Sequence, residues 1–214
     1  MTAAPTTARA DVEPVLGPSM YASPLFAAMA AIVILVTLDV AAYTYGGAPL
    51  FATTVGTSVV AFAGWMRTTF RRPASEPAAL SLYIATVVAL VALYAEQWSG
   101  DFSARLVQLY PGSYPPGIGI TNHAFVAVFP LAGSALLLTG ALTYYHGTAF
   151  GRFAAWLTFA WAAIDALAVY LYPLLAGGRM SAVPGMLTAP LPLVIALLGI
   201  RTLIRREGLR SATS

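Results

Sequence analysis

The sequence predicts an all-α integral membrane protein, a bundle of six transmembrane helices with both termini in the cytoplasm. Of the 214 residues, 59% are hydrophobic and only 9% are charged, whereas a soluble domain carries about 25% charged residues. The chain also contains six apolar stretches, and a helix needs about 20 mostly apolar residues to cross a bilayer. Its surface is therefore suited to lipid rather than to water.

The six expected spans are separated by residues that interrupt helices or mark the membrane surface. They cover residues 24–45, 50–66, 78–97, 121–145, 153–175 and 184–204. Gly46–Gly47 separates the first two spans, and the prolines and glycines of YPGSYPPGIG prevent a continuous helix in the loop 98–120. Residues 1–23 lack the charged start and apolar core of a secretory signal, so we expect a soluble tail there. We expect a transmembrane domain in residues 24–206 and a cytoplasmic tail in residues 207–214.

The distribution of arginine predicts the orientation. All eleven basic residues are arginines, and the loops on one side of the expected bundle contain most of them. These are Arg67, Arg71, Arg72, Arg152, Arg201, Arg205, Arg206 and Arg210. The opposite side has Arg105 and Arg179. Because cytoplasmic loops are enriched in basic residues, we expect the loop 98–120 to face outward, and we expect the protein in a bacterial inner membrane.

Composition also narrows the chemistry. There is no cysteine, which excludes disulfides and any metal site that needs sulfur. The arginines do not form a basic patch interleaved with aromatic residues, so we expect no nucleic-acid partner. One histidine among scattered carboxylates lacks a recognisable ligand spacing, and we expect neither a metal nor a cofactor. The expected partner is a membrane lipid or a lipid-like ester.

Polar side chains gather at one depth of the expected bundle, in the outer half of the membrane. They include Asp39, Thr53, Thr54, Glu96, Asn122, His123, Asp165 and Tyr172. An ionisable group in hydrocarbon costs at least roughly 2.5–3.5 kcal/mol, so each one needs a partner or a function. A purely structural interpretation stays open, in which the acids cap backbone groups or remain protonated and the threonines bond to their own helices.

These side chains include the types that nucleophilic catalysis requires. A threonine hydroxyl becomes a nucleophile when a base takes its proton, and histidine is suited to that task near neutral pH. Thr53 or Thr54 is the expected nucleophile and His123 the expected base, because both lie at the outer ends of their spans. Asp165 or Glu96 would orient the imidazole. The expected substrate contacts are Asp39, Asn122 and Tyr172.

Three segments carry short motifs. TYGGAPLFATT (44–54), followed by VGTSVVAF, joins the first two spans, NHAFVAVFPLAGSALL (122–137) opens the fourth, and AVYLYPLL (168–175) closes the fifth. In motif order, number of spans and total length, the chain resembles the androgen-induced family of six-span threonine hydrolases and related bacterial membrane proteins. The resemblance covers most of residues 40–200. It implies hydrolysis of lipid esters inside the membrane, such as branched fatty acid esters of hydroxy fatty acids.

The resemblance implies that Thr53 is the nucleophile, with Thr54 as an equally good choice. In the family, the catalytic histidine follows the Asn-His-Ala start by a few residues. This chain has Val126 and Ala127 there, so only His123 is available as the base.

Two other functions stay open. Asp39, Glu96 and Asp165 around an apolar cavity would protonate an isoprenoid, as in a membrane cyclase or isomerase. Alternatively, small residues such as Gly133 and Gly140 favour close helix contacts, which fits a non-catalytic subunit that binds lipid or pigment in a larger membrane complex. A cyclase or isomerase releases no acid or alcohol, and a subunit is extracted together with its partner.

Overall fold

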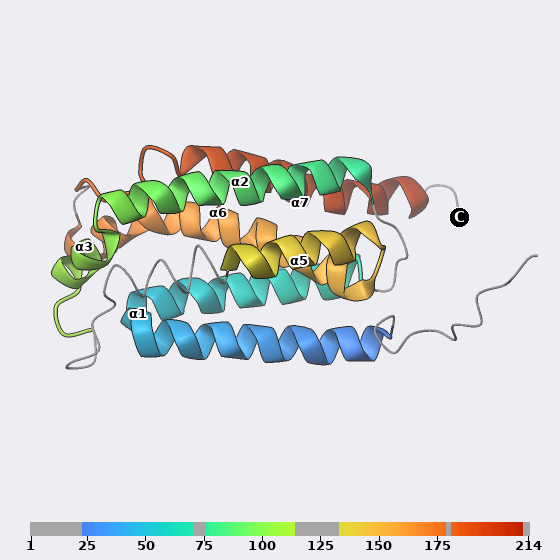
Figure 1. Cartoon of the computed structure of the whole chain (residues 1–214), viewed down its shortest axis with the longest axis horizontal. Coiled ribbons are helices and arrows are strands. Elements are labelled where there is room, and N and C mark those ends of the chain that lie inside the picture. Colours follow the sequence, from blue (N-terminus) through green and yellow to red (C-terminus); the bar gives the residue numbers. More distant parts are fainter. Residues whose placement is uncertain (1–22, 71–75, 114–132, 179–180, 212–214) are drawn as a thin grey trace, which may run out of the picture.

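The computed structural model describes residues 23–70, 76–113, 133–178 and 181–211, and within these ranges it contains helices and no strand. The helices are α1 (Pro24–Thr68), α2 (Pro77–Ser99), α3 (Phe102–Leu109), α5 (Ser134–Tyr145), α6 (Ala149–Gly177) and α7 (Pro190–Ser211). The long helices lie side by side, and the short α3 lies at one end of the bundle (Figure 1). The all-α class is confirmed for this part of the chain.

Helix α1 is a hairpin of two antiparallel arms (Figure 1). The chain turns at Gly47, whose φ of 64° and ψ of −171° lie in a region that side chains disfavour and glycine tolerates. Pro49 follows two residues later, in the first turn of the second arm, where its missing N–H costs no helical hydrogen bond. The Ser58 hydroxyl joins the two arms by donating to Asp39 Oδ1 at 3.1 Å. The predicted break at Gly46–Gly47 is therefore confirmed.

Among the described residues, four helical segments are long and apolar enough to cross a membrane, which identifies the chain as an integral membrane protein. They are Pro24–Thr44, Gly46–Thr68, Pro77–Ser99 and Ala149–Gly177. Of the expected span 121–145, residues up to 132 lie outside the described part of the chain, and α5 forms the remainder. The expected span 184–204 differs in its start, because turns occupy residues 184–189 and α7 begins only at Pro190.

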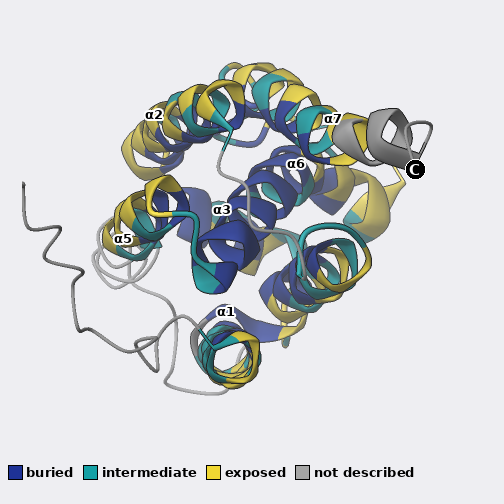
Figure 2. Ribbon diagram, turned by 90° about the vertical axis from the view of Figure 1, so that its right-hand side faces the viewer, coloured by how far each residue is buried: buried dark blue, intermediate teal, exposed yellow. Residues whose placement is uncertain are grey.

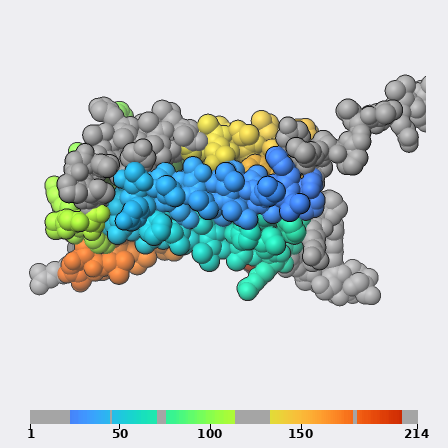
Figure 3. Space-filling model, turned by 90° about the horizontal axis from the view of Figure 1, so that it is seen from below, coloured from blue at the N-terminus to red at the C-terminus, as the bar shows by residue number. Residues whose placement is uncertain are grey.

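Helix α6 forms the centre of the bundle. It contacts each of the other five described helices and is the most buried element (Figure 2). Close approach depends on small residues facing large ones, as where Gly199 of α7 meets the ring of Phe159 and Gly64 of α1 meets Trp156. The first arm of α1 lies on the outside of the molecule (Figure 3), where its exposed apolar side chains suit contact with lipid.

A buried arginine connects two chain segments at the end of the bundle opposite α3. The guanidinium of Arg152 donates to the carbonyl oxygens of Thr69 at 2.7 Å, Gly147 at 2.6 Å and Phe70 at 3.4 Å. Carbonyl groups at the end of a helix lack intrahelical donors, and the planar guanidinium reaches several of them at once. Arg152 thereby fixes the end of α1 against the turn between α5 and α6.

Candidate functional site

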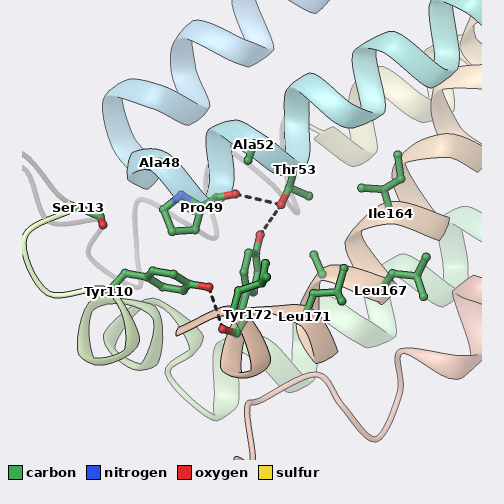
Figure 4. Close-up of a pocket in the computed structure, with 12 residues that line it drawn as sticks. Ala48, Pro49, Ala52, Thr53, Tyr110, Ser113, Ile164, Leu167, Leu171 and Tyr172 are labelled. Carbon is green, nitrogen blue, oxygen red and sulfur yellow. Dashed lines mark hydrogen bonds between the residues drawn. The ribbon is translucent and has the colours of Figure 1, made fainter. Parts of the chain in front are cut away.

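A large apolar pocket lies between the second arm of α1 and α6, close to α3 (Figure 4). Its volume is about 510 Å³, within the range of about 300–1,000 Å³ typical of small-molecule sites. The pocket is lined by Ala48, Pro49, Ala52, Thr53, Tyr110, Ser113, Ile164, Leu167, Ala168, Leu171, Tyr172 and Leu175. Because only four of these side chains carry a hydroxyl and the others are apolar, the pocket suits an apolar molecule with few polar groups.

Thr53 and Tyr172 meet on the wall of this pocket, with their hydroxyl oxygens 2.6 Å apart (Figure 4). The Thr53 hydroxyl also donates to the carbonyl oxygen of Pro49 at 3.1 Å. A hydroxyl has one proton to give, so in this arrangement the Tyr172 hydroxyl donates to Thr53 Oγ1. The pair presents a threonine oxygen and a phenol donor to the same apolar space.

Aromatic side chains at both ends of α3 hold Tyr172 in place. The Tyr110 hydroxyl donates to the backbone carbonyl oxygen of Tyr172 at 2.8 Å, and the two rings meet edge to face with centroids 6.3 Å apart. The ring of Phe102 also packs against the ring of Tyr172, with the two ring centroids 6.1 Å apart. Burial raises the pKa of Tyr110 above its usual value, because the phenolate would lose its hydration. Tyr110 therefore stays protonated and remains a donor.

A second, smaller cavity lies beside the first, and Thr53 lines both. Its other lining residues are Leu50, Thr54, Thr57, Tyr94, Phe102, Trp161 and Asp165. The space open to the centre of a water molecule is about 20 Å³, which exceeds the roughly 10–15 Å³ that one water requires. Thr53 thus separates a large apolar space from a small polar one.

The polar groups of the small cavity are oriented by hydrogen bonds. Trp161 Nε1 donates to the Tyr94 hydroxyl at 2.6 Å, and Tyr94 in turn forms a hydrogen bond with Asp165. The other carboxylate oxygen, Asp165 Oδ2, is buried and has no hydrogen-bond partner among the described residues. Buried polar atoms are nearly always paired, so this oxygen is able to accept a hydrogen bond from a small polar molecule in the cavity.

Glu96 has a different environment. Its carboxylate accepts hydrogen bonds from the backbone N–H groups of Gly185 at 2.8 Å, Leu187 at 3.2 Å and Thr188 at 2.8 Å. The Thr188 hydroxyl adds a fourth bond at 2.7 Å. These bonds fix the turns that precede α7. Of the two acids expected to orient a base, only Asp165 lines a cavity together with Thr53.

The remaining expected site residues are separate from this pair of cavities or lie outside the described residues. Asp39 lines an open groove on the outside of the α1 hairpin, with Tyr43 and Phe51, and is bonded to Ser58. Asn122 and His123 lie outside the described residues. Thr53 contacts Tyr172 and lines the small cavity together with Thr54 and Asp165. Thr54 lines only the small cavity.

Three hydrogen-bonding residues of the small cavity were not expected from the sequence, namely Thr57, Tyr94 and Trp161. Helical spacing could have indicated Thr57, because residues three and four apart lie on one face and Thr57 follows Thr53 by four. Trp161 likewise precedes Asp165 by four in α6. Nothing in the local sequence indicates the contact of Tyr94 with either of them, because it joins two helices.

Comparison with known proteins adds no assignment, since the chain matches no family model, no curated protein sequence and no solved structure. Among the described residues, no group of three or more histidine, aspartate or glutamate side chains is arranged to hold a metal ion.

Proposed function

We propose that this chain is an intramembrane hydrolase of lipid-like esters, with Thr53 as its nucleophile. The observation that carries the proposal is the position of Thr53, whose hydroxyl lies on the wall of an apolar pocket of about 510 Å³ and also borders the cavity of Asp165. An ester with an apolar chain would occupy the large pocket and present its carbonyl carbon to Thr53 Oγ1. The earlier resemblance to the androgen-induced family supports the same nucleophile.

Thr53 is favoured over Thr54 because of the space that each one reaches. Thr54 does not line the large pocket, and its hydroxyl donates to the carbonyl oxygen of Phe51 at 3.0 Å. For Thr53 to attack, its proton must leave the bond to the Pro49 carbonyl and pass to a base. We assign that base to His123, and we assign Tyr172, already 2.6 Å from Thr53, to hold the substrate carbonyl oxygen as it gains charge.

We further propose that the chain crosses a bacterial inner membrane six times, with both termini in the cytoplasm. The start of α1 and the end of α7 lie at the same end of the bundle (Figure 1). The helix ends on that side carry Arg67, Arg152 and Arg205, and basic residues are enriched at cytoplasmic ends. The orientation can be tested by introducing single cysteines at these helix ends and measuring from which side of the membrane each one is labelled. The chain has no cysteine of its own that would interfere.

The hydrolase proposal is tested by covalent labelling of the purified full-length protein in detergent. A fluorophosphonate with an octyl chain should label the protein, and Thr53→Ala should abolish labelling. Thr37→Ala is the matched control, because Thr37 bonds back to the Val33 carbonyl of the outer arm and lines neither cavity. Labelling that survives in Thr53→Ala would reject Thr53 as the nucleophile.

A second candidate is the binding of an apolar lipid or pigment without turnover. The hydrogen bond from the Thr53 hydroxyl to the Pro49 carbonyl oxygen, at 3.1 Å, favours this candidate. A threonine with only a structural role in a helix ordinarily makes such a bond. Native mass spectrometry separates the two candidates. A bound ester recovered intact after long incubation supports binding, whereas release of its acid and alcohol supports hydrolysis.

A further inference from the structure

We infer that the small cavity beside Thr53 holds the water that completes hydrolysis and that Asp165 is the base that takes a proton from this water. The inference rests on the proposed function, because it concerns the second half of the same reaction. Attack by Thr53 on an ester leaves an acyl group bonded to Thr53 Oγ1. A water molecule must then reach the new ester carbon, although the large pocket is apolar and will be filled by the acyl chain.

The small cavity can supply that water without passage through the large pocket, because Thr53 lines both spaces. Thr53 is shared by the two spaces, so an acyl group on its oxygen would extend into the large pocket and keep the small cavity as its neighbour. The open space of about 20 Å³ corresponds to about one water molecule. A single water held there would be separated from bulk solvent, as the hydrolysis of an acyl intermediate inside a membrane requires.

The hydrogen bonds around the cavity leave one group able to accept a proton. The hydroxyls of Thr54 and Thr57 donate to the carbonyl oxygens of Phe51 and Thr53, each at 3.0 Å. Asp165 Oδ2 is buried and has no hydrogen-bond partner in the described part of the chain. Leaving such an atom unpaired is costly, and a water that donates to it removes the cost. The same contact orients the water for attack.

Tyr94 and Trp161 position the carboxylate for this role. Trp161 Nε1 donates to the Tyr94 hydroxyl at 2.6 Å, and Tyr94 bonds to Asp165. These bonds connect α2 to α6 and hold the Asp165 carboxylate in the wall of the cavity that Thr53 also lines.

The step balances without any other reactant. The water oxygen bonds to the acyl carbon, and one water proton passes to Asp165 Oδ2, which gives a tetrahedral intermediate. The intermediate collapses with cleavage of the bond between the carbon and Thr53 Oγ1. Thr53 Oγ1 takes the proton back from Asp165, and the carboxylic acid leaves through the large pocket. Thr53 and Asp165 return to their starting states.

The experiment measures acylation and deacylation separately in the full-length protein. p-Nitrophenyl octanoate releases nitrophenol in a burst when Thr53 is acylated and then at the deacylation rate. General base catalysis contributes about 10²–10⁴-fold, so Asp165→Asn should keep the burst and slow the steady phase by about 100-fold. The octanoyl group should then accumulate on Thr53, where mass spectrometry of the peptide detects it.

Several results would overturn the inference. A steady rate in Asp165→Asn equal to that of the wild type would do so, and so would loss of the burst in a variant that unfolds like the wild type, because Asp165 would then act in acylation. If Asp165→Asn does not fold, Thr57→Val decides the matter, since it replaces a polar wall of the cavity by a methyl group of similar size. It should slow deacylation by about 10-fold because the water loses one hydrogen-bond partner, and an unchanged rate contradicts the inference.

These results remain distinct from failure of the proposed function. If the wild type is not labelled at Thr53 by fluorophosphonate and gives no burst, the hydrolase proposal fails, and the role of Asp165 fails with it. If the wild type is labelled and shows a burst but Asp165→Asn does not accumulate the octanoyl group, the hydrolase proposal stands and only the role of Asp165 is rejected.

Discussion

The contacts of Glu96 predict that it is a structural residue, and Glu96→Gln tests this. A glutamine keeps one acceptor oxygen and replaces the other by an amide NH₂, which cannot accept a hydrogen bond. With the NH₂ in the place of Oε2, the two bonds from Thr188, at 2.8 Å and 2.7 Å, are lost. Hydrogen bonds to a charged group contribute about 1.5–3 kcal/mol each. Since Glu96 is only half-buried, we take the lower value and expect a loss of about 3 kcal/mol in the free energy of unfolding.

The assay follows unfolding in mixed micelles of dodecyl maltoside and increasing mole fractions of SDS, with the fluorescence of the four tryptophans as the signal. Thr188→Val removes only the bond from the side-chain hydroxyl, so it should cost about 1.5 kcal/mol alone. In the Glu96→Gln background its cost should fall to about zero, because the bond is already absent. Ser99→Ala is the control, as its exposed hydroxyl bonds only to the Glu96 carbonyl of its own helix.

The structural role also predicts an effect on chemistry that is close to zero. Glu96 lines neither cavity of Thr53, so folded Glu96→Gln protein should be labelled at Thr53 by fluorophosphonate within about twofold of the wild-type rate. The reasoning is refuted if the free energy of unfolding changes by less than about 0.5 kcal/mol while labelling falls strongly. That outcome would return Glu96 to the catalytic residues.

Three further predictions follow from single contacts. Tyr172→Phe removes the hydroxyl 2.6 Å from Thr53 and should slow fluorophosphonate labelling by about 10-fold; an unchanged rate would exclude Tyr172 from the reaction. Arg152→Lys should cost about 2–3 kcal/mol in SDS unfolding, since one ammonium cannot replace a guanidinium that spans three carbonyl groups. Gly199→Ala should cost about 1–3 kcal/mol because its Cβ meets the Phe159 ring, whereas the control Gly56→Ala, with open space around it, should cost nothing.

The amino-acid sequence predicted the class of the protein and the approximate depth of its polar residues. Apolar stretches of about 20 residues favour helices in lipid, because a helix satisfies all its backbone hydrogen bonds within one segment. Gly46–Gly47 predicted the turn of the α1 hairpin, since few other residues adopt the φ of 64° found at Gly47. A fixed rise per residue then predicted that Thr53, Asp165 and Tyr172 lie in the outer half of the membrane.

Which of these residues face one another depends on how the helices pack. Depth follows from position along a helix, whereas the direction of a side chain depends on how each helix is rotated against its neighbours, and packing of small against large residues sets that rotation. This is why Asp165 meets Tyr94 and borders Thr53, while Glu96, which the sequence ranked beside it, binds the turns before α7. The start of α7 at Pro190 rather than near residue 184 accompanies the same contact, because the turns before α7 direct backbone N–H groups to the Glu96 carboxylate.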